Sequence, residues 1–362
     1  MSTDFLALPG AVAGDGPDAG VAAHYGNPLR EQRALAEGAA IVDLSHRAVL
    51  SVTGADRLSW LNSITSQSLA SLAPGVSTET LLLDQRGRVE YAAHLIDDGV
   101  SMWLLLEAEE APRLTAWLNA MKFALRVEVA DRSAEFATIG TMGEPELPLA
   151  APNGTPVVWR DPWSTVSPGG HQYALSEPHP ARTWQWSERL VTRADLAAIA
   201  EGARSVAGLL AFEALRIAAW RPRFATEVDE KTIPHELDWL RSAVHLHKGC
   251  YRGQETVAKV HNLGHPPRRL VLLHLDGSEG VLPAAEDAVS LDGKVIGRVT
   301  SAGLHFELGP IALAVVKRAT DPDVVLTVTS GATAIAAAQE IIVPTDAGGT
   351  AAVARPPRLR PR

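Results

Sequence analysis

The chain has 362 residues and a formal net charge of −9, so a general nucleic-acid-binding surface is not expected. Its single cysteine excludes an intrachain disulfide, and no apolar run approaches the roughly 18–20 residues that span a bilayer. The N-terminal segment lacks the basic start and long apolar centre of a signal peptide. These features predict a cytoplasmic protein of two or three domains that binds neither DNA nor membrane.

The first half of the chain mixes helices and strands at irregular spacing. Helical periodicity with start and stop signals occurs at three places, 28–39, 56–63 and 111–122. Strand patterns occur at four places, 49–53, 80–84, 88–92 and 102–107. Because these spacings do not fit a repeating βαβ unit, we expect an α+β fold rather than a doubly wound sheet.

The amino-acid composition changes in the middle of the chain. The segment 143–180 is rich in proline and glycine and contains Trp159 and Trp163, and it is predicted to form surface loops and turns. Residues 202–219 predict a helical passage with a broad apolar face. A further short helix is predicted over 254–261, before the stop signal of Gly264 and two prolines.

The C-terminal part consists of short strands with turns at close spacing. Strand patterns occur at 269–275, 288–291, 294–297, 311–316 and 324–328. Asp292-Gly293 between two of them is a strong hairpin signal. We therefore predict a small β-barrel over 266–343, followed by a disordered tail over 344–362.

The densest group of potentially reactive residues is Lys248-Gly249-Cys250-Tyr251-Arg252-Gly253-Gln254-Glu255, which holds the only cysteine. A thiol reacts as the thiolate, and nearby cations and a helix N-terminus favour that form. The two glycines permit a tight bend or a close approach to another group. Cys250 is thus a candidate reactive thiol, and the alternative is a small buried hydrophobic side chain.

This octapeptide resembles the signature Lys-Gly-Cys-Tyr-x-Gly-Gln-Glu of the YgfZ family of folate-binding proteins. That family is related to the T-protein (aminomethyltransferase) of the glycine cleavage system. The resemblance runs from about His24 to about Arg318. Besides the octapeptide it rests on three segments, 52–62 with Gly54-Ala55-Asp56, 215–224 and 227–237.

The resemblance implies a T-protein-like clover-leaf ring. Two interleaved N-terminal α+β modules (20–265) and the C-terminal barrel would surround a central hole that binds tetrahydrofolate. A pterin ring needs a flat apolar slot with a few polar groups, and its glutamate tail needs cations. The candidates for the tail are Arg216, Arg223, Lys248 and Arg252, each of which can equally serve as a surface or salt-bridge residue.

Two departures from the T-protein pattern bear on the reaction. The aminomethyltransferase relatives carry an acidic pair about where this chain has Tyr91 and Ala92, and Glu90 is expected to face the opposite side of the strand. The glutamate that reads the pterin in those relatives is replaced by Ala218. Aminomethyl transfer in glycine cleavage is therefore not expected.

For the YgfZ family, the resemblance implies support of iron–sulfur cluster assembly or repair in client enzymes. One cysteine cannot hold a cluster that needs about four ligands, so Cys250 would contact it transiently beside the folate, kept partly ionised by Lys248. Tyr251 is expected to pack against the pterin or the loop, and Gln254 and Glu255 to fix the helix start. Glu255 can equally be a simple acid at the helix N-terminus.

Other functions stay open at this point. The parent superfamily suggests a folate-dependent aminomethyl- or methyl-transfer enzyme, which steady turnover of a folate donor with an amine would reveal. His245 and His247 lack a third ligand fixed by the sequence, so no metal site is predicted. The expected partners are folate and iron–sulfur client or assembly proteins, and the chain is expected to be a monomer.

Overall fold

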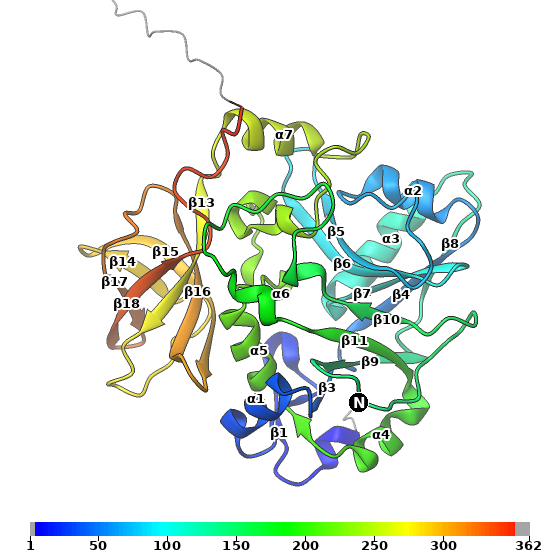
Figure 1. The fold of residues 1–362 in the computed structure, drawn as a ribbon, viewed down its shortest axis with the longest axis horizontal. Helices are drawn as coiled ribbons and strands as arrows, with labels where there is room; N and C mark the ends of the chain where they lie inside the picture. The colour runs from blue at the N-terminus through cyan, green and yellow to red at the C-terminus, as the bar shows by residue number, and fades with distance from the viewer. Residues whose placement is uncertain (1–3, 352–362) are drawn as a thin grey trace, which may run out of the picture.

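The computed structural model describes residues 4–351, which form two sheets and a barrel around a common core (Figure 1). A two-stranded ribbon near the N-terminus, β1 (Val12–Ala13) with β2 (Ala22–His24), precedes them. Within the described residues, no helix is long and apolar enough to cross a membrane.

The first sheet is antiparallel, with strand order β5-β6-β7-β4-β8. Its strands are β4 (Ala48–Thr53), β5 (Ser77–Leu83), β6 (Val89–Asp97), β7 (Ser101–Leu106) and β8 (Glu128–Asp131). One face packs against α2 (Arg57–Ile64) and α3 (Ala111–Met121) in a separate hydrophobic cluster. The opposite face packs into the central core cluster through residues such as Val49 and Leu105, so β4 and β7 are buried along almost their whole length.

The second sheet has strand order β10-β11-β9-β3-β12, and β12 runs parallel to β3. Its strands are β3 (Ile41–Asp43), β9 (Phe136–Thr141), β10 (Val158–Arg160), β11 (Ser187–Thr192) and β12 (Val206–Ala207). The helix α4 (Leu196–Gly202) packs against its outer face. Because β3 precedes the first sheet in the chain and β9 follows it, the two sheets are interleaved in sequence.

The C-terminal strands close into a six-stranded barrel in the order β13-β16-β15-β14-β17-β18. They are β13 (Arg268–Leu275), β14 (Ala288–Leu291), β15 (Lys294–His305), β16 (Gly309–Lys317), β17 (Leu326–Ser330) and β18 (Thr333–Ile341). Asp292 and Gly293 both have positive φ, 50° and 75°, as a two-residue hairpin turn requires. The predicted α+β fold with a C-terminal barrel is confirmed, and β18 is a strand that the sequence reading missed.

Four α-helices of the described residues remain. They are α1 (Pro28–Ala36), α5 (Leu209–Ala218), α6 (Phe224–Glu227) and α7 (Gln254–Leu263). In Figure 1, α5 lies between the second sheet and the barrel, whereas α7 lies at the top of the view, away from the second sheet. One large cluster of buried side chains joins Trp103 of the first sheet, Leu190 of the second and Leu313 of the barrel.

Two expectations from the sequence were wrong. The segment 143–180 is not surface loop alone, because Trp159 and Trp163 are fully buried and donate to the carbonyls of Thr78 and Ala219. Proline and glycine leave little regular structure here beyond β10 and short 3₁₀ turns, but they do not prevent burial, and the indoles find core partners.

The tail is ordered further than expected. Ala347 is buried, and the backbone N–H of Thr350 donates to the carbonyl of His261 at the end of α7. The predicted disorder is therefore wrong for 344–351, while 352–362 lie outside the described residues.

Candidate functional site

Signature residues 248–253 form a loop, the motif loop, and Gln254 and Glu255 begin α7. Gly253 has φ +84°, and a Cβ there would lie 2.5 Å from the carbonyl oxygen of Asp84. Gly87 also has positive φ and faces Thr256. Only glycine permits this contact, so the β5–β6 hairpin fixes the start of α7. Gly249 meets no neighbour within 4 Å, and the expected close approach holds for Gly253 alone.

Lys248 is directed at α2. Its ammonium group donates to the carbonyl oxygens of Asn62, Thr65 and Gln67 at 2.5, 2.6 and 2.7 Å. Three donors meet three acceptors at and just beyond the C-terminal end of that helix, where a cation is favoured. Burial lowers the pKa of Lys248 to about 8. From the sequence, Lys248 is expected to keep the thiol ionised. Its N–H groups instead donate to backbone carbonyls at the end of α2.

The other motif residues have distinct surroundings. Cys250 is exposed. Tyr251 belongs to the central core cluster, and the Lys248 ammonium lies 5.2 Å from its ring centroid. The side-chain amide of Gln254 donates to the Lys248 carbonyl at 3.2 Å, which ties the loop to the helix start. Glu255 is an exposed acid in the first turn of α7.

The three candidate arginines are all paired with acids. Arg216 is buried and donates to Glu213, Glu227 and Ser301. Arg223 is also buried, and its partners are Asp18, Glu107 and Glu213. Arg252 is half-buried and pairs with Glu90 at 2.8 Å. Each therefore has the structural role that the sequence analysis left open beside folate binding.

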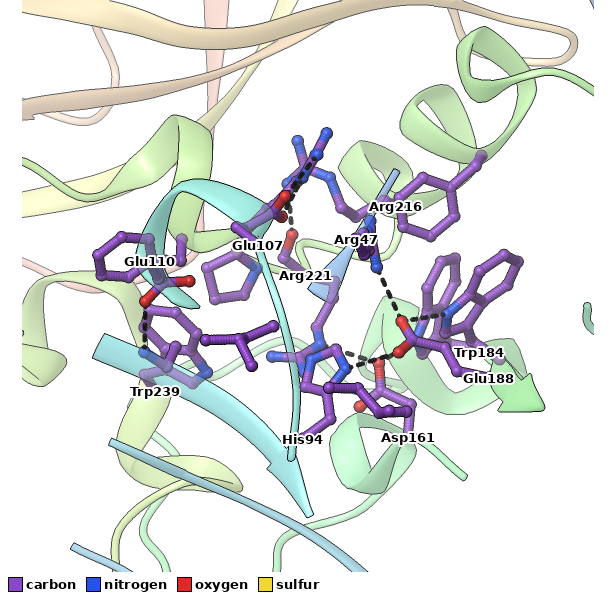
Figure 2. Close-up of a pocket in the computed structure, with 18 residues that line it drawn as sticks. Arg47, His94, Glu107, Glu110, Asp161, Trp184, Glu188, Arg216, Arg221 and Trp239 are labelled. Atoms are coloured by element: carbon purple, nitrogen blue, oxygen red, sulfur yellow. Dashed lines mark hydrogen bonds and ion pairs between the residues drawn. The ribbon is translucent and has the colours of Figure 1, made fainter. Parts of the chain in front are cut away.

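A central cavity lies where the two sheets meet α5 and residues 221–224 (Figure 2). Aromatic side chains form much of its wall, chiefly Trp184, Trp186, Phe212 and Trp239. Its volume is about 50 Å³, whereas one water needs roughly 10–15 Å³ and an engineered cavity that binds benzene has about 150 Å³. In this structure the cavity accommodates a few water molecules, and an aromatic ligand would require side chains to move.

Buried acids and bases surround this cavity. Glu188 accepts from Arg47 at 2.8 Å and lies 3.1 Å from Nδ1 of His94. Burial alone would raise the pKa of Glu188, but His94 and Arg47 outweigh it and lower the pKa to about 2. The His94 ring stacks on Trp159 with its centroid 3.7 Å away. These contacts hold the imidazole in one orientation at the cavity wall.

Three lining residues, Arg47, Glu110 and Arg221, each leave one buried polar atom without a hydrogen-bond partner among the described residues. Arg221 donates from Nε to Asp161 at 2.9 Å and from Nη2 to Glu79 at 2.7 Å, and its Nη1 is unpaired. Glu110 accepts one long backbone bond, at 3.3 Å from Ala92, and its Oε2 is unpaired. Burial, with the nearby Glu107 carboxylate, raises the pKa of Glu110 well above its usual range.

The strand β6 presents no acid to the cavity. Ala92 and His94 line it, whereas Tyr91 packs in the cluster on the other face of the sheet. Glu90 is the extra residue of a β-bulge, and its side chain points to Arg252.

The sequence reading missed His94, Glu110, Glu188 and Arg221. Arg221 lies inside the quoted run 215–224, so a count of all cations in that run would have included it. Glu110 and Glu188 belong to no motif, and only the fold brings them to the same cavity. A second cavity of about 510 Å³ beside α4 contains none of the residues predicted from the sequence.

Within residues 4–351, no group of three or more histidine, cysteine or acidic side chains is arranged to hold a metal ion. Cys250 does not line the central cavity. The thiol and the cavity are therefore separate features, whereas the sequence hypothesis placed the thiol beside the folate.

Comparisons with known proteins identify the superfamily. The model of the GCVT N-terminal domain matches residues 9–146, and that of the glycine cleavage T-protein C-terminal barrel domain matches 268–356. The chain belongs to the T-protein-like superfamily. The family assignment thus agrees with the two sheets and the closed barrel.

The relatives of this T-protein-like chain are distant. A putative chloroplastic transferase of Arabidopsis thaliana is 26% identical over 333 residues, which is 85% of this chain and 73% of that protein. An aminomethyltransferase of Symbiobacterium thermophilum is 27% identical over 296 residues, 76% of this chain and 78% of the relative. The crystal structure of glycine cleavage system aminomethyltransferase T from Bartonella henselae superposes with a TM-score of 0.73 at 19% identity, covering 94% of this chain and 96% of that one. That likeness establishes the T-protein-like fold.

Proposed function

We propose that this chain is a tetrahydrofolate-binding accessory protein of the YgfZ type, which supports iron–sulfur cluster assembly or repair in client enzymes. The observation that carries the proposal is that Cys250 is exposed on a loop anchored at both ends and does not line the central cavity. In that cavity, strand β6 contributes Ala92 and His94 and no acid. A chain built this way keeps a ligand site and a thiol for a macromolecular partner in separate places. We further expect it to act in the cytoplasm.

The central cavity suits the chemistry of a pterin ring. Its wall offers aromatic surface, and Glu110 and Arg221 each offer one unpaired polar atom. When bound, tetrahydrofolate would supply a carrier for one-carbon groups. The present volume of about 50 Å³ means that binding requires side chains to move and widen the cavity.

The glutamate tail of the folate would need a cation that can exchange its partner. Every hydrogen-bonding nitrogen of Arg216 already serves an acid, a carbonyl or a hydroxyl, so we assign Arg216 to the wall of the site. Arg223 and Arg252 have partly exposed partners, Asp18 and Glu90. A folate carboxylate could displace Glu90 from Arg252 at low cost, because exposed ion pairs contribute little, whereas displacing Asp18 would disturb the buried Arg223.

The thiol part of the proposal concerns a cluster that belongs to another protein. Cys250 is exposed and can reach a partner surface. A single thiolate could contact the cluster transiently, but four ligands are needed to hold it. The motif loop is fixed by Lys248 on α2 and by Gln254, so the thiol is presented at a defined position on the surface.

The second candidate is a folate-dependent aminomethyl- or methyl-transfer enzyme. The observation that favours it is the pairing of His94 with Glu188 at the cavity wall, which would orient an imidazole for proton transfer. Steady consumption of a folate one-carbon donor with an amine acceptor would support this candidate. The absence of turnover with intact folate binding would support the accessory role.

We expect Cys250→Ala to bind tetrahydrofolate as the wild type does and to lose the maturation of iron–sulfur client enzymes. The reason is that Cys250 lies outside the cavity lining, so its removal leaves the ligand contacts intact. Calorimetric titration with tetrahydrofolate and client activity in cells carrying the variant are the two readouts. The matched control is Ser242→Ala, a buried residue before the loop. Full client activity in Cys250→Ala would refute the thiol role.

A further inference from the structure

The indole N–H groups of the central cavity are already used within the protein. Trp184 donates to Asp161 at 2.8 Å, Trp186 to Glu188 at 3.3 Å and Trp239 to Glu79 at 3.2 Å. A ligand could therefore contact the faces and edges of these indole rings, but none of the three indole N–H groups is free to donate to it. Polar recognition in this cavity has to come from other atoms.

Three buried atoms that line the cavity lack a partner among the described residues: Glu110 Oε2, Arg221 Nη1 and Arg47 Nε. The guanidinium of Arg47 lies 5.4 Å from the Phe212 ring centroid and pairs with Glu188. Glu110 is 6% exposed and Arg221 is 4% exposed. An unpaired buried donor or acceptor is destabilising, so the unpaired atoms of Glu110 and Arg221 indicate a ligand that forms hydrogen bonds with them.

We propose that Glu110 and Arg221 read the hydrogen-bonding edge of the pterin ring, an inference that rests on the folate binding proposed above. Bound as a carboxylate, Glu110 would accept two hydrogen bonds, one from the ring N3–H and one from the adjacent 2-amino group. The Arg221 Nη1–H donates to the ring carbonyl oxygen. The ligand class is therefore a 2-amino-4-oxo heterocycle.

This assignment differs from the one that the resemblance implied. The family's pterin-reading glutamate would stand at Ala218, on α5. Glu110 instead follows β7, in the turn Ala108–Glu110 that begins α3. Asp161 and Glu79 hold the Arg221 guanidinium from two sides, which leaves only Nη1 for a ligand. The side chain proposed to recognise the pterin edge thus belongs to a different element of the same fold.

The variant that isolates the inference is Glu110→Gln, because glutamine keeps the size of the side chain but points an N–H group at one of the two ring donors. We expect its affinity for tetrahydrofolate to fall at least about tenfold, which corresponds to about 1.4 kcal/mol. Its melting temperature should not fall, because a neutral amide replaces a buried acid. The control is Glu109→Gln, an exposed neighbour on the same turn, which should bind as the wild type does.

A second arm tests Arg221 without altering the protein. The wild type is titrated with tetrahydrofolate and with the analogue that carries an amino group in place of the 4-oxo group, and at least tenfold weaker binding of the analogue is expected. Equal affinity for both ligands, or wild-type affinity in Glu110→Gln, would overturn the inference and leave the folate proposal standing. Absence of tetrahydrofolate binding to the wild type would overturn both.

Discussion

Replacing Arg216 with methionine is expected to lower the free energy of unfolding by about 3–5 kcal/mol. Arg216 is 1% exposed, and it lies between Glu213, Glu227 and Ser301. Glu227 is fully buried, so the substitution leaves a carboxylate without its cation. The cost arises mainly from that uncompensated charge and less from the loss of the ion pair itself.

The same cluster also joins parts of the fold. Ser301 belongs to the barrel strand β15, and it donates to Glu227 at 2.5 Å. Arg216→Met should therefore weaken the contact between the barrel and α5 as well. Chemical denaturation of Arg216→Met and of Arg160→Met is the measurement. Arg160 pairs with Glu144 in solvent, with side-chain exposures of 60% and 70%, and its loss should cost at most about 1 kcal/mol. Similar losses for both variants would contradict this view of the buried cluster.

Acidification is expected to destabilise the protein through His235. This side chain is fully buried, and its Nε2 lies 3.0 Å from the carbonyl of Val257 on α7. Burial lowers the pKa of His235 to about 3, with smaller contributions from His261 and His171. The unfolded chain therefore binds more protons than the folded chain between about pH 6.5 and 3. Stability falls by up to about 1.4 kcal/mol per pH unit in that window.

One neighbouring acid acts in the opposite direction. Burial raises the pKa of Asp238 to about 7, so its carboxyl stabilises the folded state as the pH falls from 7 toward 4. The contribution of His235 must therefore be read from a variant. Between pH 6.5 and 4.5, the stability difference between wild type and His235→Gln should change by about 2–3 kcal/mol against the wild type. His274→Gln, on the exposed side of the barrel, is the control. A difference that stays constant with pH would rule out the buried neutral histidine.

Local signals in the sequence were sufficient for many of the elements. Asn27 accepts from the N–H of Arg30 and starts α1 where Pro28 indicated, and Asp292-Gly293 makes the hairpin turn between β14 and β15. These features depend on residues that are neighbours in the chain. The strand β18 was missed because its alanines give no β-branched or aromatic signal.

The site was harder to predict because its parts are distant in sequence. His94 meets Glu188, and Arg221 meets Glu79, across 94 and 142 positions. Pairings of this kind follow from the order of strands in the sheets, and they cannot be inferred from the spacing of residues in the sequence. The motif loop shows the opposite case, since its sequence marked Lys248 as a partner of the thiol and its backbone directs that side chain to α2.

The central claim is that the cavity between the two sheets binds tetrahydrofolate, and calorimetric titration of Ala92→Leu tests it most directly. Ala92 lines the central cavity, so leucine would fill a space of about 50 Å³ without adding charge. The matched control is Ala198→Leu, at an exposed position that lines the second cavity. We predict that Ala198→Leu binds tetrahydrofolate like the wild type and that Ala92→Leu, still folded, binds at least about tenfold more weakly. Unchanged binding by folded Ala92→Leu would contradict the account and place the folate site elsewhere on the chain.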